Sequence, residues 1–282
     1  MTNPIQIRMG GYGPPTTGFS KSMKFIGDRL EKQFGDRIDV KYCWNIMDFG
    51  YKAEEILWLV ESGILTLGYQ SSSYLTDRVP ELSFVDLPFL FANNDKARGA
   101  MDGALGRRLV QAIESKANFR ILGWYENGFR HISNRVRTVR MPADLNGIAI
   151  RVLPSQIQKR TFELLGANPM IMDLTDAIRM IKAGEIDAQE NPLTNTVTYG
   201  VHKFHRFHTI SNHFYISRPI FLHRPTFDAW PADLKEAMQK AITESVAFQR
   251  ELHVLSRFRF QVGAREDDDR RLEPYLPRAC GG

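Results

Sequence analysis

Two short apolar segments each deliver polar side chains to their carboxyl ends. The first, Gly147-Ile-Ala-Ile-Arg-Val152, carries one guanidinium group, that of Arg151. The second, Ile186-Asp-Ala-Gln-Glu-Asn-Pro192, ends in amide and carboxylate side chains, of which Asn191 directly precedes a proline. Ligands of open α/β sheets bind at the carboxyl ends of strands, and a guanidinium group can hold a carboxylate with two parallel hydrogen bonds. The sequence therefore predicts a pocket for a small carboxylate.

Both residues also have a purely structural interpretation. Arg151 could close its strand through an ion pair with Glu163 or Glu190. Asn191 could be a turn residue, because Asn-Pro is a common turn dipeptide. A residue before proline is, however, biased toward extended backbone, which leaves the Asn191 side chain able to donate and accept hydrogen bonds. We favour contact with a ligand for both residues.

Strand and helix patterns alternate from the start of the chain. This alternation is typical of an α/β protein with mainly parallel strand pairing. Apolar residues recur at helical spacing in the helix candidates, whereas the strand candidates are short and β-branched. Strands are expected at 5–9, 38–42, 64–68, 119–125, 148–152, 170–171 and 186–188, and helices at 20–34, 52–61, 94–115, 155–165 and 175–182.

The pattern restarts beyond Tyr125, and extended segments at 209–216 and 219–222 could return to the first half. A long C-terminal helix is expected to begin at Pro231, whose fixed φ suits a first helical position, and to run past Arg250. Crossing connections of this kind produce two lobes with a cleft between them. The expected division is lobe 1 at 1–125 with 211–250 returning to it, lobe 2 at 126–210, and a divergent tail at 251–282.

The composition argues against several classes of protein. The formal charge of +5 on 282 residues comes from scattered basic residues, without the concentrated basic face that nucleic-acid binding requires. No run approaches the roughly 18 apolar residues of a membrane span, and the polar Thr2-Asn3-Pro4 does not predict an export signal. Two cysteines, Cys43 and Cys280, do not make a disulfide framework. We expect a soluble globular protein.

Several motifs occur in a characteristic order. They are Gly63-Ile-Leu-Thr-Leu-Gly68, Asp86-Leu-Pro-Phe-Leu-Phe91, Asn127-Gly-Phe-Arg-His131, Pro142-Ala-Asp-Leu-Asn-Gly147, Ile150-Arg-Val152 and Asp187-Ala-Gln-Glu-Asn-Pro192. Together they resemble the extracytoplasmic solute-binding proteins of tripartite ATP-independent periplasmic (TRAP) transporters, the DctP-like family, over about residues 5–250. The resemblance implies a periplasmic clamshell of two lobes with mixed, mainly parallel sheets. Such a protein closes over an organic acid and passes it to the membrane permease subunits of an ion-driven transporter.

The resemblance also assigns roles to particular residues. In that family the arginine matching Arg151 makes a paired contact with the ligand carboxylate, and the asparagine matching Asn191 also reaches the ligand. The arginine matching Arg130 often adds a second contact, and Gln70 matches a position that touches the rest of the ligand. From the residues alone, Arg130 could instead solvate a surface loop, and Gln70 could belong to an ordinary loop.

Two more residues are candidates for the pocket wall. Tyr12, in the glycine-rich first loop, could cover the ligand, and Leu174 could supply an apolar surface. The same loop does not predict a nucleotide site, because Pro14 and Pro15 displace the amides that a phosphate cradle needs.

No motif for catalysis, a cofactor or a metal competes with this interpretation. Lys203 and Arg206 stand between histidines whose spacing matches no zinc motif, which are His202, His205, His208 and His213. Some relatives hold a metal ion beside the carboxylate, where Glu190 could serve. No nucleophile with an adjacent base is recognisable, so we do not expect an enzyme. We expect a monomeric binding protein, and the alternative is a sensory module that presents its ligand-closed shape to a signalling partner.

Overall fold

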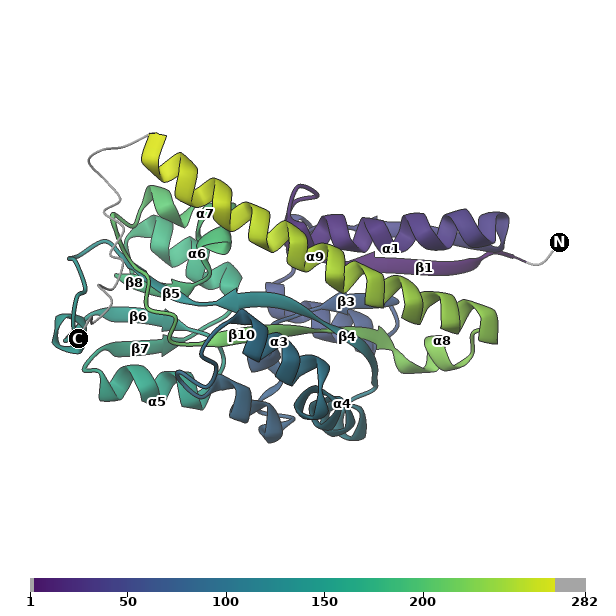
Figure 1. Ribbon diagram of the computed structural model, residues 1–282, viewed down its shortest axis with the longest axis horizontal. Helices are drawn as coiled ribbons and strands as arrows, with labels where there is room; N and C mark the ends of the chain where they lie inside the picture. The colour runs from purple at the N-terminus through teal and green to yellow at the C-terminus, as the bar shows by residue number, and fades with distance from the viewer. Residues whose placement is uncertain (1–2, 267–282) are drawn as a thin grey trace, which may run out of the picture.

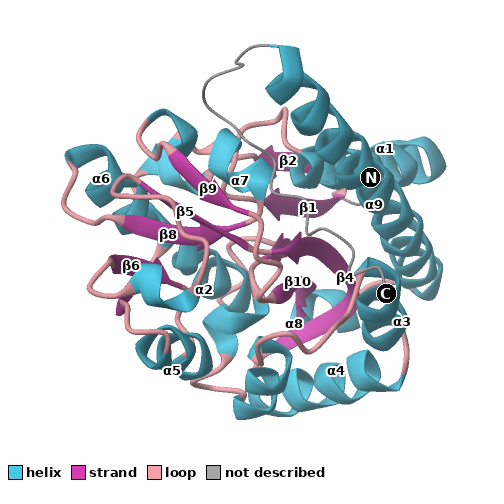
Figure 2. Ribbon diagram, turned by 60° about the vertical axis from the view of Figure 1, so that its left-hand side comes forward, coloured by secondary structure: helices cyan, strands magenta, loops and turns pink. Residues whose placement is uncertain are grey.

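The computed structural model describes residues 3–266, and the side chains up to His253. Two five-stranded sheets form the framework (Figures 1 and 2). The first sheet has the order β2-β1-β3-β10-β4, and the second has the order β7-β6-β8-β5-β9. The strands of the first sheet are β1 (Ile5–Gly10), β2 (Ile38–Cys43), β3 (Leu67–Tyr69), β4 (Phe119–Phe129) and β10 (Tyr215–His223). Those of the second are β5 (His131–Asn134), β6 (Ala149–Val152), β7 (Asn168–Ile171), β8 (Ala188–Asn191) and β9 (Phe207–Thr209).

Both sheets are mixed. Strand β1 pairs in parallel with β2 and β3, and β6 pairs in parallel with β7 and β8. Strand β10 runs antiparallel between β3 and β4, and β5 runs antiparallel between β8 and β9. The predicted fold class, a two-lobed α/β clamshell with mixed sheets, is confirmed.

Helices cover the sheets. They are α1 (Gly18–Phe34), α2 (Ile56–Glu61), α3 (Asn94–Asp102), α4 (Ala104–Lys116), α5 (Gln156–Leu164), α6 (Leu174–Ala183), α7 (Leu193–Thr198), α8 (Arg224–Asp228) and α9 (Ala232–Glu266). Helix α1 begins where Thr17 accepts a hydrogen bond from the Ser20 N–H (3.1 Å), a cap that satisfies one free donor of the first turn. Its buried residues Met23, Ile26 and Leu30 recur at helical spacing and face the first sheet.

The predicted long C-terminal helix is confirmed as α9, which runs diagonally along the molecule beside α1 and β4 (Figure 1). Gln249 of α9 accepts a hydrogen bond from the Glu126 N–H (3.0 Å) and donates one to the Glu126 carbonyl group (2.8 Å). The Tyr125 and Ser245 hydroxyl groups lie 3.2 Å apart. The rest of the predicted tail, 267–282 with Cys280, lies outside the described residues.

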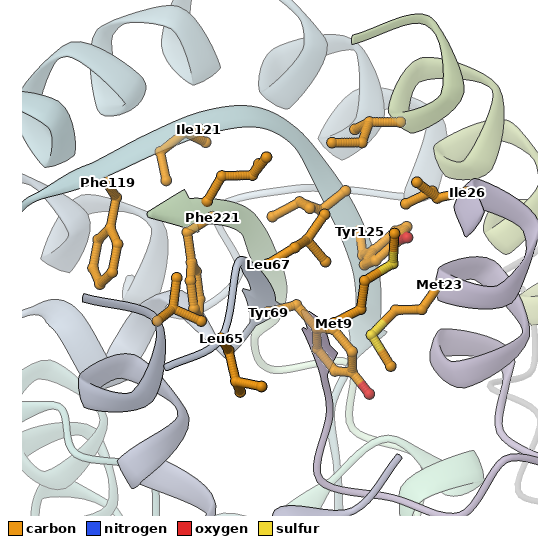
Figure 3. Close-up of a cluster of buried hydrophobic side chains, with 14 of the residues drawn as sticks. Met9, Met23, Ile26, Leu65, Leu67, Tyr69, Phe119, Ile121, Tyr125 and Phe221 are labelled. Carbon is orange, nitrogen blue, oxygen red and sulfur yellow. The ribbon is translucent and has the colours of Figure 1, made fainter. Parts of the chain in front are cut away.

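Each sheet has its own hydrophobic core. Figure 3 shows part of the larger one, in which Met9, Leu67 and Tyr69 of the first sheet face Met23 and Ile26 of α1. The smaller core lies around the second sheet and contains Ile132, Ile148, Ile150, Val152, Phe162, Ala188 and Phe214. Two separate cores are what allows two lobes to move as units.

The chain crosses between the sheets at Arg130, which separates β4 from β5, and again between Thr209 and Tyr215. The lobe limits expected at 125/126 and 210/211 remain predictions.

Some predicted elements differ from those observed. The single helix expected at 94–115 is two helices, α3 and α4, that break at Gly103. The backbone of Gly103 (φ −94°, ψ −148°) is not helical and turns the chain, and a Cβ on Gly106 would lie 1.7 Å from the Met101 carbonyl oxygen. The helix expected at 52–61 begins as a 3-10 turn, Ala53–Glu55, before α2.

Three extended segments also differ from the prediction. The strand expected at 64–68 is β3, which begins only at Leu67. Of the segment expected at 209–216, only Thr209, at the end of β9, and residues 215–216, at the start of β10, are in strands, whereas 210–214 is a loop; the segment 219–222 lies within β10. Pro219, which cannot donate to a ladder, is tolerated in β10 because β3 pairs only with residues 220–222.

Candidate ligand-binding site

A cavity lies between the two sheets, and residues from both line it. Its volume is about 10 Å³, room for about one water molecule. All six residues predicted from the sequence line it, and their roles as ligand contacts remain predictions. The lining residues are Tyr12, Gln70, Ser71, Tyr74, Asn127, Arg130, Arg151, Leu153, Leu174, Asn191, Asn195 and Arg218.

Arg151 lies on β6, where it pairs in register with Gln189 of β8, and only 1% of its surface is exposed. Its Nε atom donates to the Met172 carbonyl group (3.1 Å) and its Nη2 atom to the Tyr74 hydroxyl group (3.0 Å). Among the described residues no carboxylate lies within 4.0 Å of it. A guanidinium group has five N–H donors, so Arg151 keeps donors and a full charge for a ligand.

The two structural partners considered for Arg151 are engaged elsewhere. Glu163 pairs with Lys159 and Arg160 on its own helix. Glu190 pairs with Arg130, so neither carboxylate closes the strand end at Arg151.

Arg130 forms a buried ion pair with Glu190, and this answers the alternative that it solvates a surface loop. The two side chains are 1% and 0% exposed. Arg130 donates from Nε to one carboxylate oxygen, and from Nη2 to the other (2.8 Å) and to the Glu190 carbonyl group (2.7 Å). Burial raises the pKa of Glu190, but the charge of Arg130 and the nearby His213 ring, whose Nε2 atom lies 3.6 Å from a Glu190 carboxylate oxygen, outweigh it, so the pKa lies below its usual value. Arg130 therefore brings donors to the cavity but almost no net charge.

Gln70 and Asn191 lie on opposite walls, and the side chains of both form hydrogen bonds with neighbouring protein groups. Gln70 donates to the Ala53 carbonyl group (2.8 Å) and accepts from the Ser71 N–H (2.8 Å). Asn191 accepts from Asn195 (3.1 Å). Gln70 thus fixes the loop after β3 as well as lining the cavity.

Asn127 was not predicted from the sequence, and a β-bulge places it in the cavity wall. Gly128 and Glu126 of β4 pair with Ile216 and Ser217 of β10, so Asn127 between them has no partner in the ladder. A bulge of this kind re-aims a side chain, and it requires the positive φ (+86°) of Gly128. The buried amide nitrogen of Asn127 has no hydrogen-bond partner within the described protein.

Arg218 was also missed. It lies in β10 opposite Tyr125, and 3% of its surface is exposed. Its guanidinium carbon lies 4.0 Å from the centre of the Phe19 ring and 5.1 Å from that of Tyr12. The signal that could have revealed it is a charged residue inside the apolar run Tyr215–Leu222, because buried arginines need a partner.

Tyr12 and Leu174 form the remaining predicted walls, and both are nearly fully buried. Burial raises the pKa of Tyr12 well above its ordinary value, so its hydroxyl group stays protonated, and this group has no hydrogen-bond partner among the described residues. The Leu174 N–H donates to the Tyr74 hydroxyl group (3.1 Å), which also accepts from Arg151. Tyr74 therefore links the segment after β3 to the second sheet.

Further hydrogen bonds join residues in the range 52–73 to residues of α5 and of the start of α6, the helices beside the second sheet, and keep the cavity closed. Most join the 3-10 turn at 53–55 to the start of α6. They connect Lys52 Nζ to Asp176 Oδ2 (2.8 Å), the Ala53 N–H to Thr175 Oγ1 (3.0 Å), the Glu54 N–H to Asp173 Oδ2 (3.0 Å) and Gln158 Nε2 to Ser73 Oγ (3.1 Å). We call this set the cross-cleft contacts.

The histidines do not form a metal site within residues 3–253. No group of three or more His, Cys, Asp or Glu side chains among residues 3–253 could hold an ion. His205 is buried and hydrogen-bonds Ser133 (2.9 Å), and burial lowers its pKa to about 4. In the same range, no helix combines the length and apolar character needed to cross a membrane.

The chain was compared with known proteins. It matches the family described as bacterial extracellular solute-binding protein, family 7 (DctP), over residues 10–255. A solute-binding protein of Verminephrobacter eiseniae is 29% identical over 221 residues, which are 78% of this chain and 65% of that relative. The similar solved structures include two with bound acids. The sugar acid binding protein DctPAm of Advenella mimigardefordensis, in complex with galactonate, has 27% identity and a TM-score of 0.88, covering 94% of this chain and 85% of that one.

The second is a TRAP periplasmic solute-binding protein of Sulfurospirillum deleyianum with bound succinate. It has 25% identity and a TM-score of 0.83, covering 93% of this chain and 86% of that chain. The family match spans most of the described residues, including the second sheet, the strands β2, β3, β4 and β10 of the first sheet and the residues that line the cavity. The chain therefore belongs to the DctP family of bacterial extracellular solute-binding proteins.

Proposed function

We propose that this protein binds a small organic acid between its two sheets, in the periplasm, and delivers it to the membrane permease subunits of a TRAP transporter. The observation that carries the proposal is the buried, unpaired guanidinium group of Arg151 in a cavity that both sheets line. An anionic ligand would supply the missing countercharge, and contacts with both sheets would stabilise the closed form.

The similar proteins support an acid as the ligand. One is described with galactonate and the other with succinate, which share a carboxylate but differ in the rest of the molecule. The family is one of solute-binding transport proteins, and we propose binding without turnover, as a monomer.

Arg151→Met tests the proposal. Calorimetric titration with galactonate and with succinate should show affinity for at least one acid in the unchanged protein, and a loss of about 30-fold or more in the variant. Removing one partner of a buried charge pair costs about 2–5 kcal/mol. Arg151→Lys should also bind weakly, because an ammonium group cannot hold a carboxylate bidentately.

Arg179→Met is the matched control, because Arg179 is exposed on α6 and pairs with Glu185. It should leave the affinity unchanged. Unchanged affinity in Arg151→Met, with the variant folded, would rule out the proposed role of Arg151.

A further inference from the structure

The cavity contains three buried arginines, and they differ in how their charges are balanced. Arg130 is neutralised by Glu190. Arg151 and Arg218 form no ion pair within 4.0 Å with any carboxylate of the described chain. The carboxylate of Asp173, which precedes the wall residue Leu174 in sequence, accepts instead from the backbone N–H groups of Glu54 and Thr175. The protein therefore places two uncompensated positive charges around one small space.

The surroundings of Arg218 leave part of its guanidinium group available. Its contacts are the faces of aromatic rings, at 4.0 Å (Phe19), 5.1 Å (Tyr12) and 5.7 Å (Tyr69) from the ring centres, and the nearby Tyr199 side chain. Stacking on rings uses the face of the guanidinium plane and leaves its edge for hydrogen bonds. The buried Nε atom has no hydrogen-bond partner in the described chain.

The two unpaired arginines come from different sheets. Arg218 lies on β10 of the first sheet and Arg151 on β6 of the second. A ligand with one anionic group can neutralise only one of them, whereas a buried charge without a partner is costly. A ligand with an anionic group at each end neutralises both and bridges the two sheets.

We propose that Arg218 is a specificity-determining residue that binds a second anionic group, so that the preferred ligands are dianionic acids such as dicarboxylates rather than monocarboxylates. This inference rests on the proposed function, in which Arg151 holds the first carboxylate. The aromatic rings hold the guanidinium group of Arg218 in place, and its edge meets the far end of the ligand.

Matched acids test the inference by calorimetry at pH 7.5. Galactarate and galactonate share a six-carbon hydroxylated chain and differ by one carboxylate, and succinate and butanoate form the same comparison on four carbons. In at least one pair, the unchanged protein should bind the diacid at least about tenfold more tightly than the monoacid. Arg218→Met should weaken binding of that diacid about 30-fold or more, and should change binding of its monoacid partner less than about threefold.

Two further variants separate charge from structure. Arg218→Lys keeps the positive charge and should retain a preference for the diacid, at reduced affinity. Arg120→Met is the control, because Arg120 lies on the same sheet but pairs with Asp228 at the surface, and it should leave both affinities unchanged. The melting temperature of ligand-free Arg218→Met should be equal to or above that of the unchanged protein, because the substitution removes an uncompensated buried charge.

Three results would overturn the inference. The first is a monoacid that the unchanged protein binds as tightly as its diacid partner, a measurement that needs no variant. The second is an equal loss of both affinities in Arg218→Met, and the third is a lower melting temperature of that variant without ligand. If monoacids bind tightly through Arg151, only this inference fails. If none of the four acids binds, the proposed function fails with it.

Discussion

The ion pair of Arg130 with Glu190 allows a sharp prediction about stability. Both side chains are at most 1% exposed, and three hydrogen bonds connect Arg130 to Glu190. Glu190→Gln keeps the shape of the side chain but removes the negative charge, and its amide group turns a donor toward the donors of Arg130. Breaking one partner of a buried pair costs about 3–5 kcal/mol, so the free energy of unfolding should fall by that amount.

Urea unfolding followed by circular dichroism measures the effect. With an m value of about 3 kcal/mol/M, the midpoint should fall by about 1 to 1.7 M. Glu163→Gln is the matched control, because Glu163 forms ion pairs only at the surface of α5, and it should move the midpoint very little.

The pH dependence of the effect has a definite sign. The folded-state pKa of Glu190 lies below its usual value, so the carboxylate contributes stability above the unfolded pKa of about 4.3 and loses it as the pH falls through the folded pKa. The difference between the unchanged protein and Glu190→Gln should therefore be full at pH 7 and shrink as the pH falls below about 4.

A double-mutant cycle completes the test. The double variant Arg130→Met, Glu190→Gln should lose less free energy of unfolding than the two single variants lose in sum. The difference should be about 2 kcal/mol or more, on the order of the coupling in buried pairs. Additive effects within about 0.5 kcal/mol, or a loss below about 1 kcal/mol in Glu190→Gln alone, would refute the view that Glu190 neutralises Arg130.

Two other residues give independent predictions. Burial raises the pKa of Asp86 to about 6, so the protonated carboxyl group stabilises the fold at low pH and this contribution is lost as the pH rises through 6. Asp86→Asn cannot ionise. Between pH 4 and pH 7, its free energy of unfolding, measured with urea, should therefore rise by about 2–3 kcal/mol relative to that of the unchanged protein. A flat difference across that range would contradict this. Gly128→Ala should destabilise the fold by about 1–3 kcal/mol, because its φ is +86° and the new Cβ would lie 2.8 Å from His253 Nε2. Gly147 has a similar φ of +75°, but no atom lies within 4 Å of an added Cβ, so Gly147→Ala should lower the free energy of unfolding by less. Equal losses in the two variants would mean that the contact with His253 is unimportant.

Part of the site could be predicted because it depends on local pattern. Arg151 and Asn191 were expected at the carboxyl ends of two strands; they lie near the end of β6 and at the end of β8, which is Ala188–Asn191 instead of the expected 186–188, and these strands pair in parallel, which brings the ends together. The strand pairing alone thus makes two polar side chains neighbours. The positions of most helices could also be predicted locally, from apolar residues that recur at helical spacing. Gly103 and Gly106 carried the signal for the break between α3 and α4, which the helical spacing concealed.

The rest of the site depends on contacts between distant parts of the chain. Arg218 reaches the cavity only because β10 inserts between β3 and β4, more than 80 residues away in sequence. Asn127 reaches it through a bulge whose position is set by the register with β10. Local sequence also could not show that Glu190 neutralises Arg130 and leaves Arg151 unpaired, because this depends on where three side chains meet.

The cross-cleft contacts have a consequence for the speed of uptake. They join protein groups to one another, so they favour approach of the two sheets regardless of what lies between them, and a space of about 10 Å³ does not admit an acid of four or more carbons. A ligand can therefore enter only after these hydrogen bonds break. The observed association rate should level off at high ligand concentration at the rate of opening, and every tenfold bias toward the shut form should weaken the apparent affinity about tenfold.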